Sequence, residues 1–109
     1  MRYLFLICTD QTAEPHDPAS DNIDEWVAEM DGRGTRILGN RLRAAAEAIT
    51  VKRRHGKLVV TDGPFAETKE IIAGFDVIEC ADREEAIEIA SKHPMSRFGQ
   101  IEIREFWRG

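Results

Sequence analysis

Residues 71–94 read IIAGFDVIECADREEAIEIASKHP, and this stretch passes from a strand pattern directly into a helix pattern. Residues 71–80 are mostly apolar, which is typical of a strand within a covered sheet. Gly74 interrupts this run and predicts a bulge or a point of close backbone approach. A strand that leads at once into a helix is one half of a split β-α-β unit.

The helix that follows is marked at both ends. Asp82 can cap its first turn, and Glu85, three residues later, can complete a capping-box arrangement with it. His93-Pro94 ends the helix, because a residue that precedes proline disfavours the helical conformation. The expected apolar stripe of this helix consists of Ala86, Ile87 and Ala90.

The first third of the chain repeats the order of strand, helix and strand. Residues 2–8 (RYLFLIC) predict a central strand, residues 9–20 a loop, and residues 35–39 (TRILG) a second strand. Ser20 or Asp21 can cap the helix between the two strands. The apolar face of that helix is expected to hold Ile23, Trp26, Val27 and Met30.

The remaining segments add a hairpin and a closing strand. Residues 48–54 and 57–61 flank His55-Gly56, and a glycine in so short a turn predicts a β-hairpin. Residues 100–107 (QIEIREFW) alternate between apolar and polar, as a strand does. The order predicts a single α+β domain over residues 1–109, with the ferredoxin-like split β-α-β fold and an inserted β-hairpin.

Two helices cover only one face of such a sheet, so the other face needs a partner or a polar surface. The strands hold too many apolar residues for a wet face. We expect six apolar residues to call for a partner, namely Phe5, Phe75, Val77, Ile101, Ile103 and Phe106. The pattern therefore predicts a homodimer whose two sheets pack face to face.

The composition excludes several classes of protein. The 109 residues are 42% hydrophobic and 32% charged, and the formal charge of −5 argues against a nucleic-acid partner. No apolar run approaches the roughly 20 residues that span a bilayer, so we expect no membrane partner. Residues 1–10 lack a cleavage site of the secretory type, and we expect a cytoplasmic protein in which Cys8 and Cys80 form no disulfide.

The stretch VTDGPFAETKE at residues 60–70 joins a turn to a cluster of charges. Asp62-Gly63-Pro64 has the chemistry of a turn. That chemistry does not explain why Phe65, Glu67, Lys69 and Glu70 follow at once. Carboxylates around one ammonium can share and shift protons if they are partly buried, and they form only a charged loop if they are solvated.

The segment DGPFAETKE at residues 62–70 resembles the signature of the YCII-related family, in the branch named for its DGPF motif. The resemblance extends over nearly the whole chain. It includes MRYLFLI, GNRL, ITVKRRHGKLVVTDGPF, IIAGFDVIEC, DREEAIEIA and HPMSRFGQIEIREF. It implies a dimeric α/β-barrel built from ferredoxin-like protomers.

The resemblance implies less about function. Proteins of this branch are mostly uncharacterised, some are encoded beside extracytoplasmic-function sigma factors, and relatives include small-molecule lyases and dehalogenating enzymes. The wider family is thought to use a His and an Asp, with the His on the first helix. The segment DNIDEWVAEM at residues 21–30 has no His, so a site of that type has to use other groups. Asp62 is the best carboxylate to carry over.

Of the three histidines, only His93 is a candidate for a functional role, and two roles are open to it. His93 is either a helix-terminal residue that favours the helix dipole or a group that transfers protons. His16 lies in a loop and His55 in the hairpin turn, so both are expected in solvent. Because the three histidines are scattered and no cysteine cluster accompanies them, we expect no metal site and no cofactor.

Three other residues are candidates for contact with a ligand. Arg41 can bind an anion at the mouth of the sheet or simply lie on a surface loop. Trp26 can stack on a planar ligand or belong to the core. Phe65 can supply an apolar wall. The basic hairpin tip at residues 52–57 lacks interleaved aromatic residues, which disfavours a nucleic-acid site.

The sequence leaves two functions open. In the first, the protein binds or transforms a small molecule by proton transfer, as an isomerase or lyase does. Catalysis then involves Asp62, Lys69 and His93, while Arg41, Phe65, Glu67 and Trp26 bind the substrate. In the second, the protein is a regulatory or interaction module without catalysis, and residues 62–70 form structural contacts between subunits.

Overall fold

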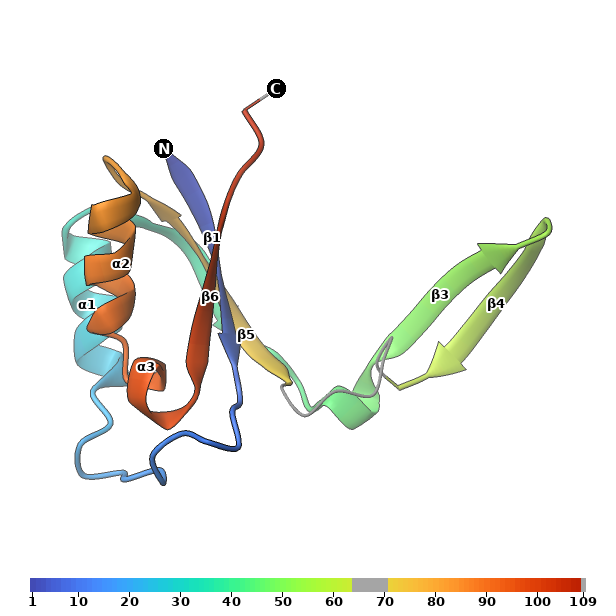
Figure 1. Ribbon diagram of the computed structural model, residues 1–109, viewed down its shortest axis with the longest axis horizontal. Coiled ribbons are helices and arrows are strands. Elements are labelled where there is room, and N and C mark those ends of the chain that lie inside the picture. The colour runs from blue at the N-terminus through green and yellow to red at the C-terminus, as the bar shows by residue number, and fades with distance from the viewer. Residues whose placement is uncertain (64–70, 109) are drawn as a thin grey trace.

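The computed structural model describes residues 1–63 and 71–108 of the chain (Figure 1). Within these ranges, six strands and the helices α1 and α2 follow the predicted order, and the short helix α3 was not predicted. Their bounds are β1 (Arg2–Cys8), α1 (Ile23–Gly32), β2 (Arg36–Arg41), the 3₁₀ turn η1 (Ala45–Glu47), β3 (Ile49–Arg54), β4 (Lys57–Asp62), β5 (Ile72–Glu79), α2 (Arg83–Ser91), α3 (Met95–Phe98) and β6 (Gln100–Glu105).

Four strands form an antiparallel sheet in the order β2-β5-β1-β6. The helices α1 and α2 lie side by side on one face of this sheet (Figure 1). The two central strands, β1 and β5, each lead into one of these helices, and β2 and β6 lie at the edges. This is the ferredoxin-like arrangement. The α+β, ferredoxin-like prediction is therefore confirmed.

The core lies between the sheet and the two helices. Phe5, Met30, Ile78, Ala86 and Ile89 have no exposed surface. The sequence expectation for α2 was wrong at one position, because Ile87 is 43% exposed while Ile89 is buried. Spacings of three and four residues place Ala86, Ile89 and Ala90 on one helical face, whereas Ile87 points away from it.

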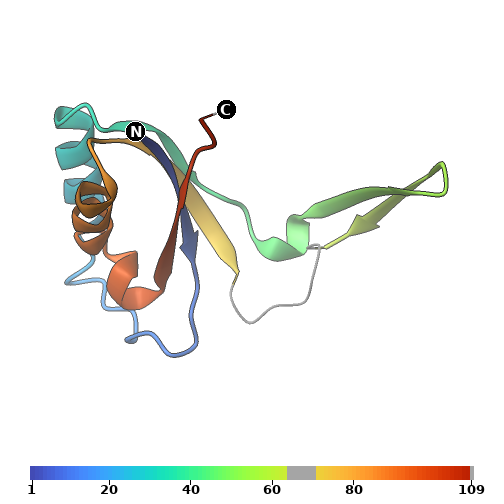
Figure 2. The same ribbon diagram turned by 45° about the horizontal axis from the view of Figure 1, so that its top comes forward.

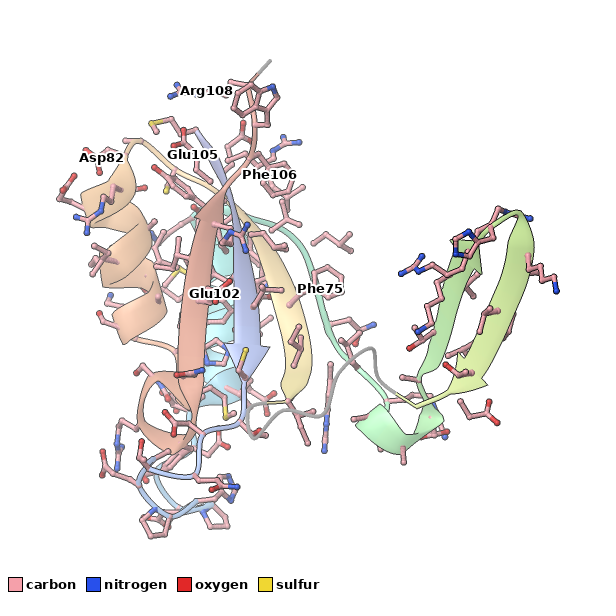
Figure 3. The ribbon with its side chains drawn as sticks, turned by 45° about the vertical axis from the view of Figure 1, so that its right-hand side comes forward. Phe75, Asp82, Glu102, Glu105, Phe106 and Arg108 are labelled. Atoms are coloured by element: carbon pink, nitrogen blue, oxygen red, sulfur yellow. The ribbon has the colours of Figure 1, made fainter. Side chains whose placement is uncertain are left out.

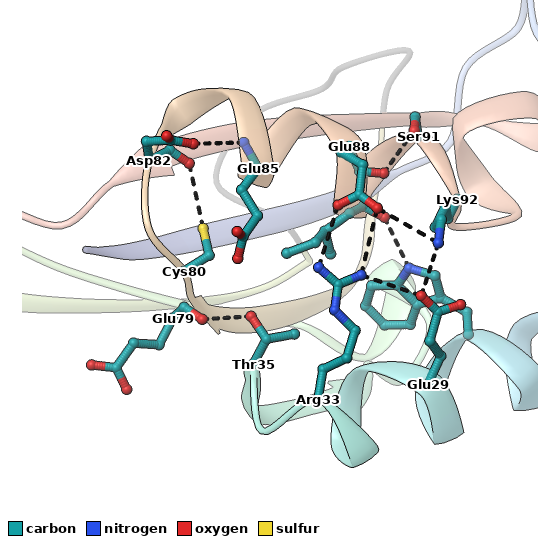
Figure 4. Close-up of polar contacts among 12 residues, drawn as sticks. Glu29, Arg33, Thr35, Glu79, Cys80, Asp82, Glu85, Glu88, Ser91 and Lys92 are labelled. Carbon is teal, nitrogen blue, oxygen red and sulfur yellow. Dashed lines mark hydrogen bonds and ion pairs between the residues drawn. The ribbon is translucent and has the colours of Figure 1, made fainter.

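The caps of the two helices differ. Asp82 accepts a hydrogen bond of 2.9 Å from the amide of Glu85, as predicted for α2. Helix α1 has no side-chain cap from its flanking Asn22, and Asp21 instead bonds the amide of Ile23. Across the outer surface, charged side chains join α1 to α2 (Figure 4). These contacts link Glu29, Arg33, Glu88 and Lys92.

The open face is the face of the four-stranded sheet that is turned away from the helices, and it differs from the prediction. Phe5 pairs with Ile103 and with Asp76, and all three share the helix side. The same parity places Ile101 on that side, where it packs against the core. The prediction that Phe5, Ile101 and Ile103 face outward was therefore wrong.

Phe75 and Val77 do lie on the open face, as expected. Figure 3 shows the Phe75 side chain on the side of the sheet away from the helices. The register places five apolar side chains on this face, which are Leu4, Leu6, Leu38, Phe75 and Val77. Glu102 and Arg104 on the edge strand β6 add a charged margin, in which the two side chains pair at 3.3 Å.

The strands β3 and β4 form the predicted hairpin, which extends away from the rest of the molecule (Figures 1 and 2). His55 (φ 53°) and Gly56 (φ 78°) make its turn. Positive φ at both central positions is the type I′ geometry that fits the twist of a hairpin. The hairpin forms a separate two-stranded sheet, so it contributes nothing to the core.

None of the helices in the described part of the chain is both long enough and apolar enough to cross a membrane.

Candidate active site

A pocket of about 650 Å³ opens between α1, the segment that joins α2 to α3, and the helix side of the sheet. Apolar side chains line much of it, and a small group of polar side chains converges there. The polar and aromatic residues that line it from the helix side are Thr9, His16, Asp21, Trp26, Arg36, Arg41, Asp76 and His93. Asn40 and Phe75 also border it, although their strand positions alternate with those of Gly39 and Asp76.

His93 is buried in the wall of this pocket. The helix α2 ends just before it, and Pro94, the N-cap residue of α3, follows directly, so the ring lies in a tight turn between two helices. Its Nδ1 accepts a hydrogen bond of 3.0 Å from the amide of Met95. The neutral ring therefore carries its proton on Nε2.

The surroundings keep this histidine neutral. Burial lowers the pKa of His93 to about 4, since a charged imidazolium loses its hydration there. The Asp21 carboxylate opposes this shift, and the Arg36 guanidinium adds to it. The ring also packs edge-on against Trp26, with centroids 4.6 Å apart. His93 is therefore an uncharged hydrogen-bond donor at neutral pH.

Asp76 is the buried carboxylate of the site. It lies on β5 and is only 5% exposed, and its Oδ1 accepts a hydrogen bond of 2.9 Å from Nε of Arg36 on β2. Burial raises the pKa of Asp76, while the bond from Arg36 limits the rise. A carboxylate with little hydration is a stronger base than one in water.

Gly39 makes room for this ion pair. It lies opposite Asp76 in the register of β2 and β5. A Cβ atom at position 39 would collide with Oδ1 of Asp76 and lie 2.7 Å from Nη2 of Arg36. The GNRL segment noted in the sequence therefore contains a glycine that the site requires.

The described residues leave one atom of each key group open to the pocket. They supply no hydrogen-bond partner for Nε2 of His93 or for Oδ2 of Asp76. Among the described residues, no fully buried side-chain nitrogen or oxygen lacks a partner, so these two atoms keep some accessible surface, and both residues line the pocket. The pocket therefore presents an N–H donor and a carboxylate acceptor.

Asp21 and His16 bring the long first loop to the pocket. His16 Nε2 lies 2.8 Å from Oδ2 of Asp21. This hydrogen bond, and a weaker contribution from the amide of Ile23, lower the pKa of Asp21. The expectation that His16 is simply solvated was incomplete, because its ring also packs edge-on against Phe98 at 5.1 Å.

Three of the residues predicted for the site line the pocket. Trp26 is 2% exposed, and its Nε1 donates a hydrogen bond of 2.9 Å to the carbonyl of Ile89. Its ring forms both core and pocket wall, so the two alternatives given for it coincide. Arg41 is exposed at the mouth. His93 lies deep in the wall.

The other predicted residues lie elsewhere. Asp62 is exposed at the end of β4, opposite Ile49, and it is not among the residues that line the pocket. Phe65, Glu67 and Lys69 lie outside the described residues. The role assigned to Asp62 and its neighbours stays a prediction.

Sequence reasoning missed Asp76 and Arg36, although one signal was present. Asp76 is the only charged residue within the apolar run at residues 71–78. It shares strand parity with Ile78, which is fully buried. An acid in the buried register of a strand needs a partner, and this requirement marks a functional site or a structural ion pair.

No cluster of three or more His, Cys, Asp or Glu side chains in the described ranges has the arrangement of a metal site. The polar groups of the pocket are instead suited to hydrogen bonding and proton transfer.

The profile of the YCII-related domain matches residues 1–108. The chain belongs to the YCII-related family. An uncharacterized protein of Rhizobium meliloti (strain 1021) is 46% identical over 50 residues, which cover 46% of this chain. The match spans 40% of that relative's length.

A solved structure supports the same fold. It is the 5-chloro-2-hydroxyhydroquinone dehydrochlorinase of Burkholderia phenoliruptrix AC1100, in complex with 2,5-dihydroxybenzoquinone. The TM-score is 0.50 at 14% sequence identity, and the alignment covers 100% of this chain and 96% of the other. At that identity the likeness concerns the fold of this YCII-related protein and not its activity.

Proposed function

We propose that this YCII-related protein binds a small, polarised molecule in the pocket and transfers a proton on it, as an isomerase or lyase does. The observation that carries the proposal is a buried, neutral His93 that shares one pocket with the buried carboxylate of Asp76. Buried polar groups with an open donor and an open acceptor cost stability, so a fold that retains them has a use for them.

The two groups have complementary roles. The Nε2 proton of His93 binds a substrate oxygen and stabilises negative charge as it develops there. A neutral imidazole can do this without first gaining a proton, because its Nε2 already carries a hydrogen. Oδ2 of Asp76 accepts the proton that leaves the adjacent carbon, and Arg36 holds the carboxylate in place through Oδ1.

The rest of the pocket supports binding. Trp26 offers an aromatic surface to a flat ligand, and Arg41 at the mouth can attract an anionic group. The dehydrochlorinase with a similar fold holds a flat quinone in its solved complex. This makes 2,5-dihydroxybenzoquinone a reasonable first probe compound for the present pocket.

We further propose that the protein forms a homodimer of the α/β-barrel type. The open face, with its apolar side chains, supports this arrangement, because one face of the sheet has no helix over it. The DGPFAETKE segment at residues 62–70 supports placing the chain in the DGPF-motif branch of the family.

A regulatory or interaction module is the second candidate. The observation that favours it is the hairpin, whose apolar side chains are exposed on a segment that lies apart from the pocket. The two functions predict different ligands, so a binding experiment separates them.

The test is an amide NMR titration of the full chain with 2,5-dihydroxybenzoquinone and a set of aromatic acids. Shifts are expected at pocket residues, including the amides of Gly39 and Gly74 and the indole N–H of Trp26. The Asp76→Asn variant should weaken binding by about tenfold, which is typical for losing a charged hydrogen-bond partner.

Asp31→Asn is the matched control. Asp31 also pairs with Arg36, at 3.5 Å, but it is exposed and does not line the pocket. Its affinity for the same compound should stay within about twofold of the native value. Shifts confined to the hairpin, or no shift with any compound, would contradict the proposed function and favour the interaction module.

A further inference from the structure

One face of the β3–β4 hairpin is apolar and exposed. The register pairs Val51 with Val60 and Arg53 with Leu58, which places these side chains on the same face. Ile49 and Asp62 form a further pair on this face, so it carries four apolar side chains together with Arg53 and Asp62. The exposures of the four apolar side chains are Ile49 67%, Val51 61%, Leu58 58% and Val60 56%.

The rest of the described chain leaves this face uncovered. The hairpin strands are extensively paired with each other, and they have at most isolated contacts with the other described elements. The views of Figures 1 and 2 agree that the hairpin extends away from the four-stranded sheet. A two-stranded hairpin alone is at best marginally stable in water, so a surface that covers its apolar face would stabilise it.

The charge of the hairpin restricts the identity of that surface. Residues 49–62 contain four of the fifteen Lys and Arg residues and one of the twenty acids, Asp62, so the hairpin carries +3 and the rest of the chain −8. The four basic residues are Lys52, Arg53, Arg54 and Lys57. Among the described residues, none of these four has an ion-pair partner.

A second copy of the same chain meets both requirements. Its body is strongly acidic, which complements the basic hairpin, and its own hairpin needs the same cover. In a two-fold symmetric pair each hairpin can contact the other body, so every contact occurs twice. Because each contact occurs twice, even a short segment can add substantially to the buried surface area, which is roughly 800 Å² for each partner of a specific interface.

We propose that the β3–β4 hairpin is an arm that lies against a second copy of this chain. Its apolar face, which also carries Arg53, contacts the partner. Lys52, Arg54 and Lys57 lie on the opposite face, and their charge attracts the acidic body of the partner. The proposal rests on the homodimer proposed above and adds a second, separate contact to it. It also gives a role to the basic hairpin tip other than nucleic-acid binding.

The test compares two neighbouring residues on opposite faces of β4. Val60→Lys places a charge on the apolar face, and Thr61→Lys places the same charge on the other face. Both positions are exposed, so both variants should keep the native circular dichroism spectrum. Sedimentation equilibrium of the full chain should show a dissociation constant at least tenfold higher for Val60→Lys and within twofold of native for Thr61→Lys.

A third variant separates this proposal from the homodimer itself. Leu6→Lys changes the open face of the sheet and should weaken the dimer whether or not the arm contacts the partner. If Leu6→Lys dissociates the dimer while Val60→Lys leaves it unchanged, the homodimer stands and the arm is refuted. If the native chain sediments as a monomer at all concentrations, both proposals are refuted.

A direct measurement locates the arm. In a mixed dimer of isotope-labelled and unlabelled copies, nuclear Overhauser effects should connect the methyl groups of Val51 and Val60 to the other copy. Effects that arise only within one copy, between the hairpin and its own sheet, would overturn the proposal. Higher salt should also weaken the native dimer, because attraction between exposed charges is screened.

Discussion

The helix–sheet body and the hairpin arrange their residues in opposite ways. The body buries polar groups, with Asp76 and His93 at 5% and 4% exposure. The hairpin exposes apolar groups, with Val51 at 61%. Each arrangement costs free energy in an isolated chain. The comparison supports both proposals, because a polar interior suits a ligand and an apolar exterior suits a partner.

The largest loss of stability is expected when Trp26 is removed. Trp26→Ala removes a ring that is 2% exposed, contacts His93 and bonds the carbonyl of Ile89. We expect the free energy of unfolding to fall by about 3–5 kcal/mol, measured by urea denaturation. Trp107→Ala is the control, because Trp107 is 92% exposed, and it should change stability by less than about 0.5 kcal/mol at concentrations where the chain is monomeric. Equal losses would contradict the contrast between the two regions.

The next effect is the pH dependence that His93 confers. Because its pKa falls to about 4 on folding, the unfolded chain binds a proton that the folded chain does not bind between pH 4 and 6.5. Stability contributed by neutral His93 is therefore present above pH 6.5 and lost as the pH falls toward 4, by about 3 kcal/mol in total.

Urea denaturation at a series of pH values measures this loss. The His93→Gln variant should remove this part of the pH dependence, whereas His55→Gln, at the exposed hairpin turn, should retain it. A native slope that persists in His93→Gln would show that another group is responsible.

A smaller effect is expected at Gly39. The Gly39→Ala variant forces apart the pair formed by Asp76 and Arg36, so we expect a loss of about 1–3 kcal/mol together with weaker ligand binding. Gly32→Ala is the control, because a Cβ there meets no atom within 4 Å. If thermal and urea unfolding show the two variants to be equally stable, Gly39 is not needed to accommodate the ion pair.

The smallest effect is expected in the hairpin. At concentrations where the chain is monomeric, Val60→Lys should change the free energy of unfolding by less than about 1 kcal/mol, since that side chain contributes nothing to the core. Its effect should appear instead in the dimer dissociation constant. A loss as large as that of Trp26→Ala would mean that the hairpin packs on its own body.

The sequence was sufficient to predict the fold because local patterns determine it. Strand and helix periods gave the order of elements, and His55-Gly56 gave the hairpin turn. It was harder to predict which face of the sheet each side chain occupies. A nearly continuous apolar strand such as β1 has no alternation to show which side is buried. Phe5 was assigned to the wrong face for this reason.

The site was predictable only in part. His93 and Trp26 stood out by residue type, and the structure places both at one pocket. Asp21 and His16 reach it through the loop at residues 9–20, whose path no periodicity encodes. The Asp76–Arg36 pair depends on which strands become neighbours, so it required the order β2-β5 before its two members could be connected.

The most direct test of the central claim is the protonation state of His93, measured by following its ring ¹⁵N and ¹³C chemical shifts with pH. The burial of the ring and the bond from Met95 to Nδ1 predict a neutral ring with its proton on Nε2 at pH 7, and a midpoint near pH 4. A midpoint near 6.5, or a proton on Nδ1, would contradict the claim that His93 presents an N–H donor to the pocket.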